Sequence, residues 1–287
     1  MTSLLSQARR DFHARLVSDA TLMVDAAGIA SNADKSQKTS REVALFVAER
    51  LGAVRGEAKT VGQRAGSQFE AAVREFLAAT FPRFATLRPG TWSVEDVGGK
   101  RGEYHLAKFE PYSHLDDLAR AIEQSPMLVS ALGNSYEISP DVFIARAPET
   151  DEVINRDEVL VDQGSGNRAL IRAANQERRI VHAVVSCKWT LRSDRAQNAR
   201  SEALNVIRNR KGRTPHIVVV TGEPTPSRLA SLALGTGDLD MVYHFALPEL
   251  IEGVAASGND EAISMLGHLI EGKRLRDISD LPLDLAI

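Results

Sequence analysis

The segment from Ile180 to Thr221 constrains the fold of this chain most strongly, because it contains two apolar runs separated by a helical pattern. Ile180–Val185 is rich in β-branched residues, and His216–Thr221 is a second continuous apolar run. Between them, a helix is expected from about Asp194 to Asn209. Two apolar strands joined by a helical crossover are typical of a parallel sheet with both faces covered. The sequence therefore predicts an α/β fold.

Apolar periodicity predicts further elements on both sides of this segment. Helices are expected over residues 41–51, 66–81 and 114–123, and strands over 138–145, 159–161 and 241–246. The polar composition of residues 31–40 predicts a loop, and the C-terminal tail contains another helical pattern. We find neither an internal repeat nor an interdomain linker, so residues 1–287 are expected to form a single domain.

Composition excludes several classes of protein. Hydrophobic residues make up 43% of the 287 residues and charged residues 25%, which is ordinary for a globular protein and excludes a fibrous or disordered chain. Apolar runs such as Ile217–Val220 are too short to span a membrane, and Arg9, Arg10 and Arg15 interrupt any signal-peptide core. The single cysteine, Cys187, permits no intrachain disulfide. We therefore expect a cytoplasmic protein without a membrane partner.

Basic residues are concentrated in one part of the chain, although the formal net charge of the whole is −3. Residues 188–213 contain eight lysines and arginines and two acidic residues, a local net charge of +6. Such a concentration suits contact with a phosphate backbone. A solvated helix face is the alternative interpretation.

Carboxylates and a lysine at strand ends suggest phosphodiester hydrolysis, which needs a divalent cation, carboxylates to hold it and a further cation near the phosphorus. Asp141 stands beside one predicted strand and Lys188 ends another. Many nucleases carry an acidic residue two positions before this lysine, on the same strand face, but here that position is Ser186. Glu202, in the following helix, can replace it if the helix crosses the site, and Glu70 is a further candidate.

Each of these residues also has a purely structural interpretation. Asp141 follows a proline and can belong to a turn, and Lys188 can extend its ammonium into water from a strand end. Glu70 can pair with Arg74 one helical turn away, and Glu202 can face solvent. The catalytic hypothesis therefore depends on all four side chains converging.

Arg192, Asp194 and Arg195 follow the predicted catalytic strand closely and suit the reading of G·C base pairs. Arginine forms a bidentate pair with guanine O6 and N7, and aspartate accepts from the cytosine amino group. Two arginines and one aspartate can therefore read two adjacent G·C pairs. In a twofold dimer the reading is repeated, which gives a palindromic CCGG core. Alternatively, the aspartate balances the helix dipole and the arginines contact only phosphates.

At this point the sequence resembles a known family, the type II restriction endonucleases of the NgoMIV type, which cut around CCGG. The resemblance is carried by four stretches, SCKWTLRSDRAQNARSEALN, RNRKGRTPHIVVVTGEPTPSR, LALGTGDLD and KRLRDISDLPLDL. Weaker similarity extends from residue 31 to the C-terminus, while residues 1–30 and 147–178 resemble the family least.

This resemblance implies a restriction-endonuclease-like core of the PD-(D/E)xK type, with a central mixed β-sheet flanked by α-helices and a helical N-terminal region. It implies Mg²⁺ at Asp141 and at the carbonyl of Cys187, with Lys188 near the scissile phosphate. Glu70 and Glu202 are implied to complete the acidic cluster.

The resemblance also implies how double-stranded DNA is read. The residues carried over are Arg192, Asp194 and Arg195 for the inner CCGG, Gln63 for the minor groove, and Asp34, Ser36 and Arg228 for an outer G·C pair. The implied target is GCCGGC, bound by a homodimer that assembles into a homotetramer.

Two rival functions remain open from the sequence. A structure-selective repair nuclease can use the same core, but it has no need of paired base-reading side chains. A sequence-specific DNA-binding protein without cleavage gains nothing from acidic residues that repel phosphate. Dependence of cleavage on Mg²⁺ separates these possibilities.

Overall fold

A six-stranded mixed β-sheet forms the centre of the protein in a computed structural model, which describes residues 2–56, 62–96, 105–124, 127, 140–191, 193–235 and 237–287. The strands lie in chain order across the sheet: β1 (Trp92–Asp96), β2 (Val142–Arg146), β3 (Ile180–Lys188), β4 (His216–Thr221), β5 (Met241–His244) and β6 (Leu275–Asp277). β1 and β2 are antiparallel to their neighbours, whereas β3 to β6 are parallel to one another.

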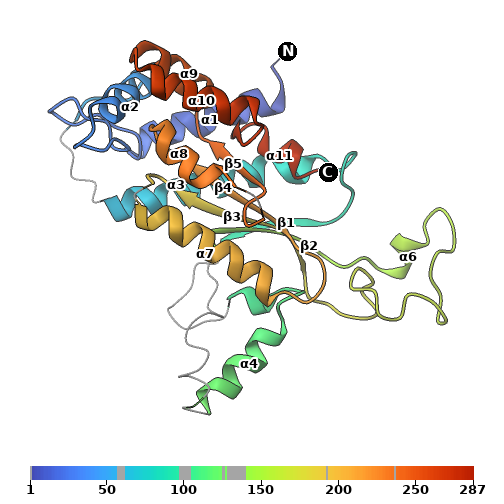
Figure 1. The fold of residues 1–287 in the computed structure, drawn as a ribbon. Helices are drawn as coiled ribbons and strands as arrows, with labels where there is room; N and C mark the ends of the chain where they lie inside the picture. The colour runs from blue at the N-terminus through green and yellow to red at the C-terminus, as the bar shows by residue number, and fades with distance from the viewer. Residues whose placement is uncertain are drawn as a thin grey trace.

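Helices precede the sheet, connect its strands and follow it (Figure 1). They are α1 (Leu4–Ser18), α2 (Lys38–Arg50), α3 (Gly62–Thr80), α4 (His114–Glu123), α6 (Asp151–Ile154), α7 (Ser193–Asn209), α8 (Pro226–Ala233), α9 (Leu247–Ala256), α10 (Asp260–Glu271) and α11 (Leu281–Asp284). Short 3₁₀ turns lie at Phe81–Arg83 and His105–Lys108. Within the described ranges, no helix is long and apolar enough to cross a membrane.

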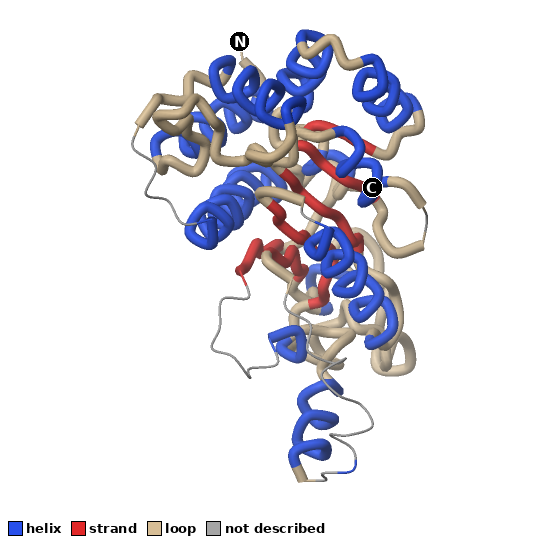
Figure 2. The backbone as a smooth tube through the Cα atoms, turned by 60° about the vertical axis from the view of Figure 1, so that its left-hand side comes forward, coloured by secondary structure: helices blue, strands red, loops and turns tan. Residues whose placement is uncertain are grey.

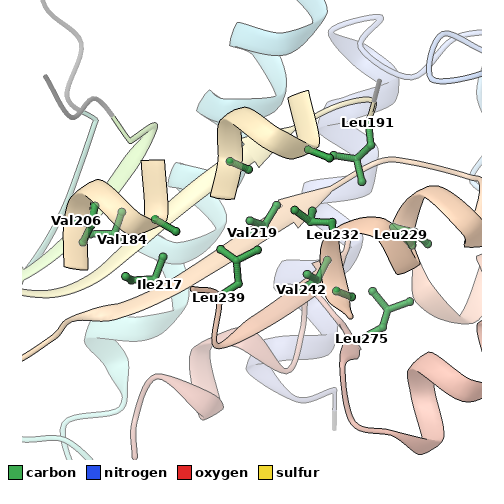
Figure 3. Packing of buried hydrophobic residues seen from close by; sticks show 14 of the residues in the cluster. Val184, Leu191, Val206, Ile217, Val219, Leu229, Leu232, Leu239, Val242 and Leu275 are labelled. Carbon is green, nitrogen blue, oxygen red and sulfur yellow. The ribbon is translucent and has the colours of Figure 1, made fainter. Parts of the chain in front are cut away.

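The two faces of the sheet are covered by different helices, as Figure 2 shows from a second direction. Side chains of α7, α8 and α10 pack on one face, where Val184, Ile217, Val219 and Val242 form the core seen in Figure 3. Side chains of α1, α3 and α11 pack on the opposite face. Alternate residues of β4 therefore enter different cores, which explains why this strand is apolar at consecutive positions.

Strand pairing determines which chain ends meet at the edge of the sheet. Val142 of β2 pairs with Val185 of β3 in antiparallel register, so the residue before β2 lies beside the end of β3. Lys188 at that end pairs with Thr221, the last residue of β4. The entrance of β2 and the exits of β3 and β4 are therefore neighbours.

Most predicted elements are confirmed, and some with the same bounds. Helix 114–123 and strand 216–221 are observed as predicted, and β3 and β4 form the predicted parallel pair. α2 begins at Lys38, inside the stretch 31–40 that was expected to be a loop. The expected strand 138–145 corresponds to β2, although residues 138 and 139 lie outside the described residues.

The strand predicted at residues 159–161 is wrong. This segment belongs to an arm that extends away from the sheet beside α6 (Figure 1) and has no strand neighbour. Instead, the backbone amides of Leu160 and Val161 both donate to the side-chain oxygen of Asn155, at 2.9 Å. Val159 and Leu160 remain 77% and 62% exposed, so their apolar character does not reflect burial in a sheet.

Candidate active site and base-reading residues

Asp141 and Lys188 meet at the edge of the sheet because β2 and β3 are antiparallel there. The carboxylate oxygen Oδ2 of Asp141 accepts a hydrogen bond from the backbone amide of Cys187 at 2.6 Å. The same oxygen lies 3.3 Å from Nζ of Lys188. Both side chains are largely shielded, with exposed fractions of 17% and 15%. The predicted pairing of an acid at one strand end with a lysine at the other is therefore present.

Glu202 reaches the same place from α7, which crosses the face of the sheet that carries Lys188. Its Oε2 lies 3.7 Å from Nζ of Lys188 and accepts a hydrogen bond from the hydroxyl of Ser186 at 3.0 Å. Ser186 stands two residues before the lysine, where the acidic residue of many nucleases lies. The serine thus holds the helix carboxylate above the position that a strand carboxylate would occupy.

Glu70 approaches this cluster from α3, on the opposite face of the sheet. Burial raises its pKa to about 7, and the negative charges of Asp141 and Glu202 add to this effect, while Lys188 opposes it. Arg74, the structural partner considered for Glu70, pairs instead with Asp96. The effect of the other carboxylates on Glu70 means that all of them share one electrostatic environment.

The cluster contains three carboxylates, of Asp141, Glu70 and Glu202, and one lysine. Burial raises the pKa of Glu202 even though Lys188 and Ser186 act in the opposite direction. Burial alone disfavours the charged form of Lys188, but Asp141 and Glu202 outweigh this and raise its pKa. Lys188 therefore stays protonated, while the surrounding carboxylates repel one another.

The donor set fits a hard divalent cation such as Mg²⁺. Within the part of the chain that the structure describes, no three His, Cys, Asp or Glu side chains form a ready-made metal cage. Mg²⁺ does not require one, because it usually takes one or two carboxylates and keeps several waters. The buried thiol of Cys187, whose pKa burial raises strongly, is a poor donor, but its backbone carbonyl is an oxygen ligand of the right type.

Asp34, Ser36 and Arg228, which the resemblance assigns to an outer base pair, lie together although α8 and the residue 31–40 segment are far apart in sequence. Oδ1 of Asp34 accepts from the backbone amide and hydroxyl of Ser36, at 2.9 and 2.7 Å. Its Oδ2 pairs with the guanidinium of Arg228. The hydroxyl and amide of Ser36, together with Arg228, lower the pKa of Asp34 to about 2. This carboxylate is therefore ionised at neutral pH.

The remaining predicted base-reading residues are only partly described. Arg192 lies outside the described residues. The backbones of Asp194 and Arg195 form the first turn of α7, directly after the strand that carries Lys188, and the backbone of Gln63 lies at the start of α3. The segment predicted to read the inner CCGG, residues 192–195, therefore begins four positions after the candidate catalytic lysine.

Sequence reasoning missed Glu223, which lies two residues after β4 and is only 1% exposed. Its carboxylate accepts from the backbone amides of Leu191 and Thr225, at 2.8 and 3.1 Å. The preceding Gly222 has no room for a side chain, because a Cβ there would stand 2.5 Å from the ring of Trp189. The only sequence signal for Glu223 was its position just beyond the end of an apolar strand.

Comparison with known proteins identifies the class. The chain is 47% identical to "Type II restriction enzyme NgoMIV" from Neisseria gonorrhoeae over 287 residues, which is 100% of both chains. It is thus a type II restriction endonuclease, a site-specific deoxyribonuclease, as predicted. The sequence profile described as "NgoMIV restriction enzyme" matches residues 12–287, so the chain belongs to the NgoMIV restriction enzyme family.

One comparison with a solved structure adds little. The chain in "Restriction endonuclease PspGI-substrate DNA complex" is 12% identical, with 98% of this chain and 91% of that chain covered. The TM-score is 0.25, which is too low to establish a shared topology. The assignment to the family therefore depends on the two sequence comparisons.

Proposed function

We propose that this endonuclease hydrolyses both strands of DNA at the palindrome GCCGGC, in a Mg²⁺-dependent reaction that leaves 5′-phosphate ends. The observation that carries the proposal is the convergence of Asp141, Lys188 and Glu202, with Ser186 in contact with the glutamate. Divalent cations are typical cofactors of restriction endonucleases. The excess of carboxylates over cations at this edge of the sheet supports such a cofactor here.

Asp141 and the backbone carbonyl of Cys187 would hold Mg²⁺, with Glu70 and Glu202 completing the acidic surroundings. When bound there, the cation lowers the pKa of the attacking water and offsets negative charge on the phosphate. The amide of Cys187 orients the Asp141 carboxylate, since it donates to Oδ2 from the adjacent strand.

Lys188 would stabilise the charge that develops on the phosphoryl oxygens during attack. Asp141 and Glu202 keep its ammonium protonated and fix its position, so it is preorganised for this role. Departure of the 3′ oxygen gives the 5′-phosphate product. The carboxylates supply no favourable contact to DNA themselves, which is why a non-cleaving binding protein does not explain the cluster.

Sequence recognition would be divided between two parts of the chain. Arg192, Asp194 and Arg195 would read the inner CCGG, and Gln63 would enter the minor groove. Asp34 and Arg228, with Ser36, would read the outer G·C pair. Their pairing supports this role, because an arginine and an ionised aspartate held side by side match guanine and its cytosine partner.

The palindrome requires two copies of the reading surface, and we propose a homodimer in which one subunit reads each half-site. We also propose that two such dimers assemble into a homotetramer, as the family resemblance implies, and that each chain forms one domain. Sedimentation analysis with and without a GCCGGC duplex measures this assembly directly.

Plasmid cleavage tests the proposal. Purified protein is incubated with plasmid containing GCCGGC, in Mg²⁺ and in EDTA, and the fragment ends are mapped. Discrete Mg²⁺-dependent ends within GCCGGC are expected. Ends at other CCGG sites would retain the reaction and reject the outer base pair, whereas specific binding without cleavage would reject the catalytic assignment.

A further inference from the structure

Glu223 is a buried carboxylate that the proposed reaction does not use. It lies in the turn between β4 and α8, and its two oxygens accept from two different chain segments. Oε2 accepts from the amide of Leu191 at 2.8 Å, and Oε1 accepts from the amide of Thr225 at 3.1 Å. Thr225 occupies the N-cap position of α8, without a capping hydrogen bond from its side chain. One side chain therefore joins the start of α8 to the residue directly before Arg192.

Leu191, at one end of this connection, is held in place by core packing. Its side chain is 1% exposed and belongs to the same apolar core as Leu229 and Leu232 of α8 (Figure 3). The amide of Leu191 is therefore held by core packing on one side and by Glu223 on the other. The chain that enters the inner recognition segment, residues 192–195, starts from this point.

Glu223 also lies close to Arg228, which is proposed to read the outer base pair together with Asp34. Nη1 of Arg228 lies 3.8 Å from Oε2 of Glu223, and its Nη2 pairs with Asp34. A second contact joins the same two regions, since the side-chain amide of Asn32 donates to the carbonyl of Gly222 at 2.7 Å. Oε2 of Glu223 thus lies between the guanidinium of Arg228 and the amide of Leu191.

We propose that Glu223 is a positioning residue that couples recognition of the outer base pair to recognition of the inner CCGG. This inference rests on the proposed reading roles of Asp34, Arg228 and residues 192–195. A displacement of Arg228 at the outer pair shifts the carboxylate, and through it the start of the inner segment. Specificity at the two positions is then linked within one subunit.

The same contacts are also expected of a residue that only stabilises the β4–α8 turn, so the test must separate the two roles. Glu223→Gln is nearly isosteric but keeps one acceptor oxygen, so one of the two amides loses its partner. Asp277→Asn is a matched control on β6, which β5 separates from β4. Asp277 is also buried, accepts from the amides of Leu247 and Ser279, and pairs with an arginine, Arg9.

The experiment compares full-length wild type, Glu223→Gln, Asp34→Asn and Asp277→Asn on DNA duplexes with six randomised base pairs. Cleaved duplexes are sequenced in Mg²⁺, bound duplexes are sequenced after a gel shift, and thermal unfolding is recorded for each protein. Glu223→Gln is expected to raise tolerance at the outer and inner positions together, by roughly tenfold each. Asp277→Asn is expected to lower thermal stability and leave the preferences unchanged.

Asp34→Asn keeps the test decisive if Glu223→Gln does not fold, because Asp34 is partly exposed. Coupling predicts that this outer-pair variant also relaxes the inner positions. The inference is overturned if Glu223→Gln loses stability but keeps the wild-type preferences, or if Asp34→Asn leaves inner preferences intact. A wild type that selects another sequence, or binds without cutting, rejects the proposed function, while the comparison between variants still decides the coupling.

Discussion

Two shielded charge clusters in this protein shift the pKa values of their glutamates in opposite directions. At the candidate active site, Glu70 and Glu202 have raised pKa values because burial and neighbouring carboxylates outweigh the single lysine. Beside β6, the guanidinium of Arg9 lies 2.9 Å from Asp277 and 2.5 Å from Glu249. There the guanidinium outweighs burial, so the pKa values of both carboxylates are lowered.

The difference supports the proposal that the Arg9 cluster is structural and that the Lys188 cluster is catalytic. Asp277 receives backbone and hydroxyl hydrogen bonds in addition to Arg9, so the protein itself balances the charge. At the candidate active site, burial and neighbouring carboxylates raise the pKa values of Glu70 and Glu202, so the protein does not fully stabilise their ionised forms. Such an imbalance lowers the stability of the fold and is best explained by a ligand that supplies the missing positive charge.

The largest expected effect follows from removing the lysine of the unbalanced cluster. Lys188→Ala is expected to reduce the single-turnover rate of DNA cleavage by about 10³-fold or more, because the transition-state charge loses its cation. Binding to a GCCGGC duplex is expected to change only a few-fold, as measured by gel shift. Wild-type cleavage by this variant would remove Lys188 from the mechanism.

Removing the cation of the balanced cluster is expected to act on stability instead. Arg9→Met leaves Asp277 and Glu249 without their partner and should lower the free energy of unfolding by about 3–5 kcal/mol. Urea denaturation measures this loss. The cleavage rate per folded molecule at a permissive temperature is expected to stay at the wild-type value. A loss of cleavage without a loss of stability would contradict the structural role of the Arg9 cluster.

Removing one carboxylate is expected to change the free energy of unfolding in opposite directions in the two clusters. The folded-state pKa of Glu70 is about 7, above its ordinary 4.5, so its ionised form destabilises the fold increasingly as the pH rises through this window. Glu70→Gln in EDTA at pH 8 should therefore stabilise the protein by about 1–2 kcal/mol, allowing for partial exposure.

This gain should shrink as the pH falls toward 4.5, where folded and unfolded chains both bind the proton. Glu249→Gln is the matched comparison, because its folded-state pKa is lowered and its ionised form stabilises the fold. It should be destabilising at pH 8. Urea denaturation of both variants across this pH range tests the pair. If both substitutions changed the free energy of unfolding in the same direction at pH 8, the comparison would be contradicted.

An exposed cluster provides the smallest expected effect. Arg120 on α4 lies near Asp116 and Asp117, but the three side chains are 53–79% exposed. Arg120→Ala is expected to change the free energy of unfolding by less than about 0.5 kcal/mol, because water screens such pairs. A larger change in urea denaturation would show that charge number, rather than burial, governs these clusters.

The sequence predicted the parts of the fold whose burial is complete. β3 and β4 are buried from both faces, so their apolar runs were clear signals. β1 was missed because it is an edge strand of mixed polarity, and β6 because it has only three residues. The run at 159–161 misled because apolar residues on an exposed arm give the same signal as a short strand.

The candidate site was predictable where strand pairing alone brings residues together. Asp141 and Lys188 meet through the register of β2 and β3, and the helix after Lys188 carries Glu202 back over the strand. Glu223 was not predictable, because its partner Leu191 is 32 positions away and Gly-Glu-Pro resembles an ordinary turn. Contacts between loops depend on tertiary packing that no local pattern encodes.

The most direct measurement is the single-turnover rate of GCCGGC cleavage as a function of Mg²⁺ concentration, for wild type, Asp141→Asn and Asp277→Asn. Both substitutions remove one charge from a shielded cluster. The wild type and Asp277→Asn are expected to cleave with the same Mg²⁺ dependence, while Asp141→Asn loses cleavage at every concentration. Cleavage by Asp141→Asn at the wild-type rate, or cleavage without a divalent cation, would contradict the assignment of the unbalanced cluster as the catalytic metal site.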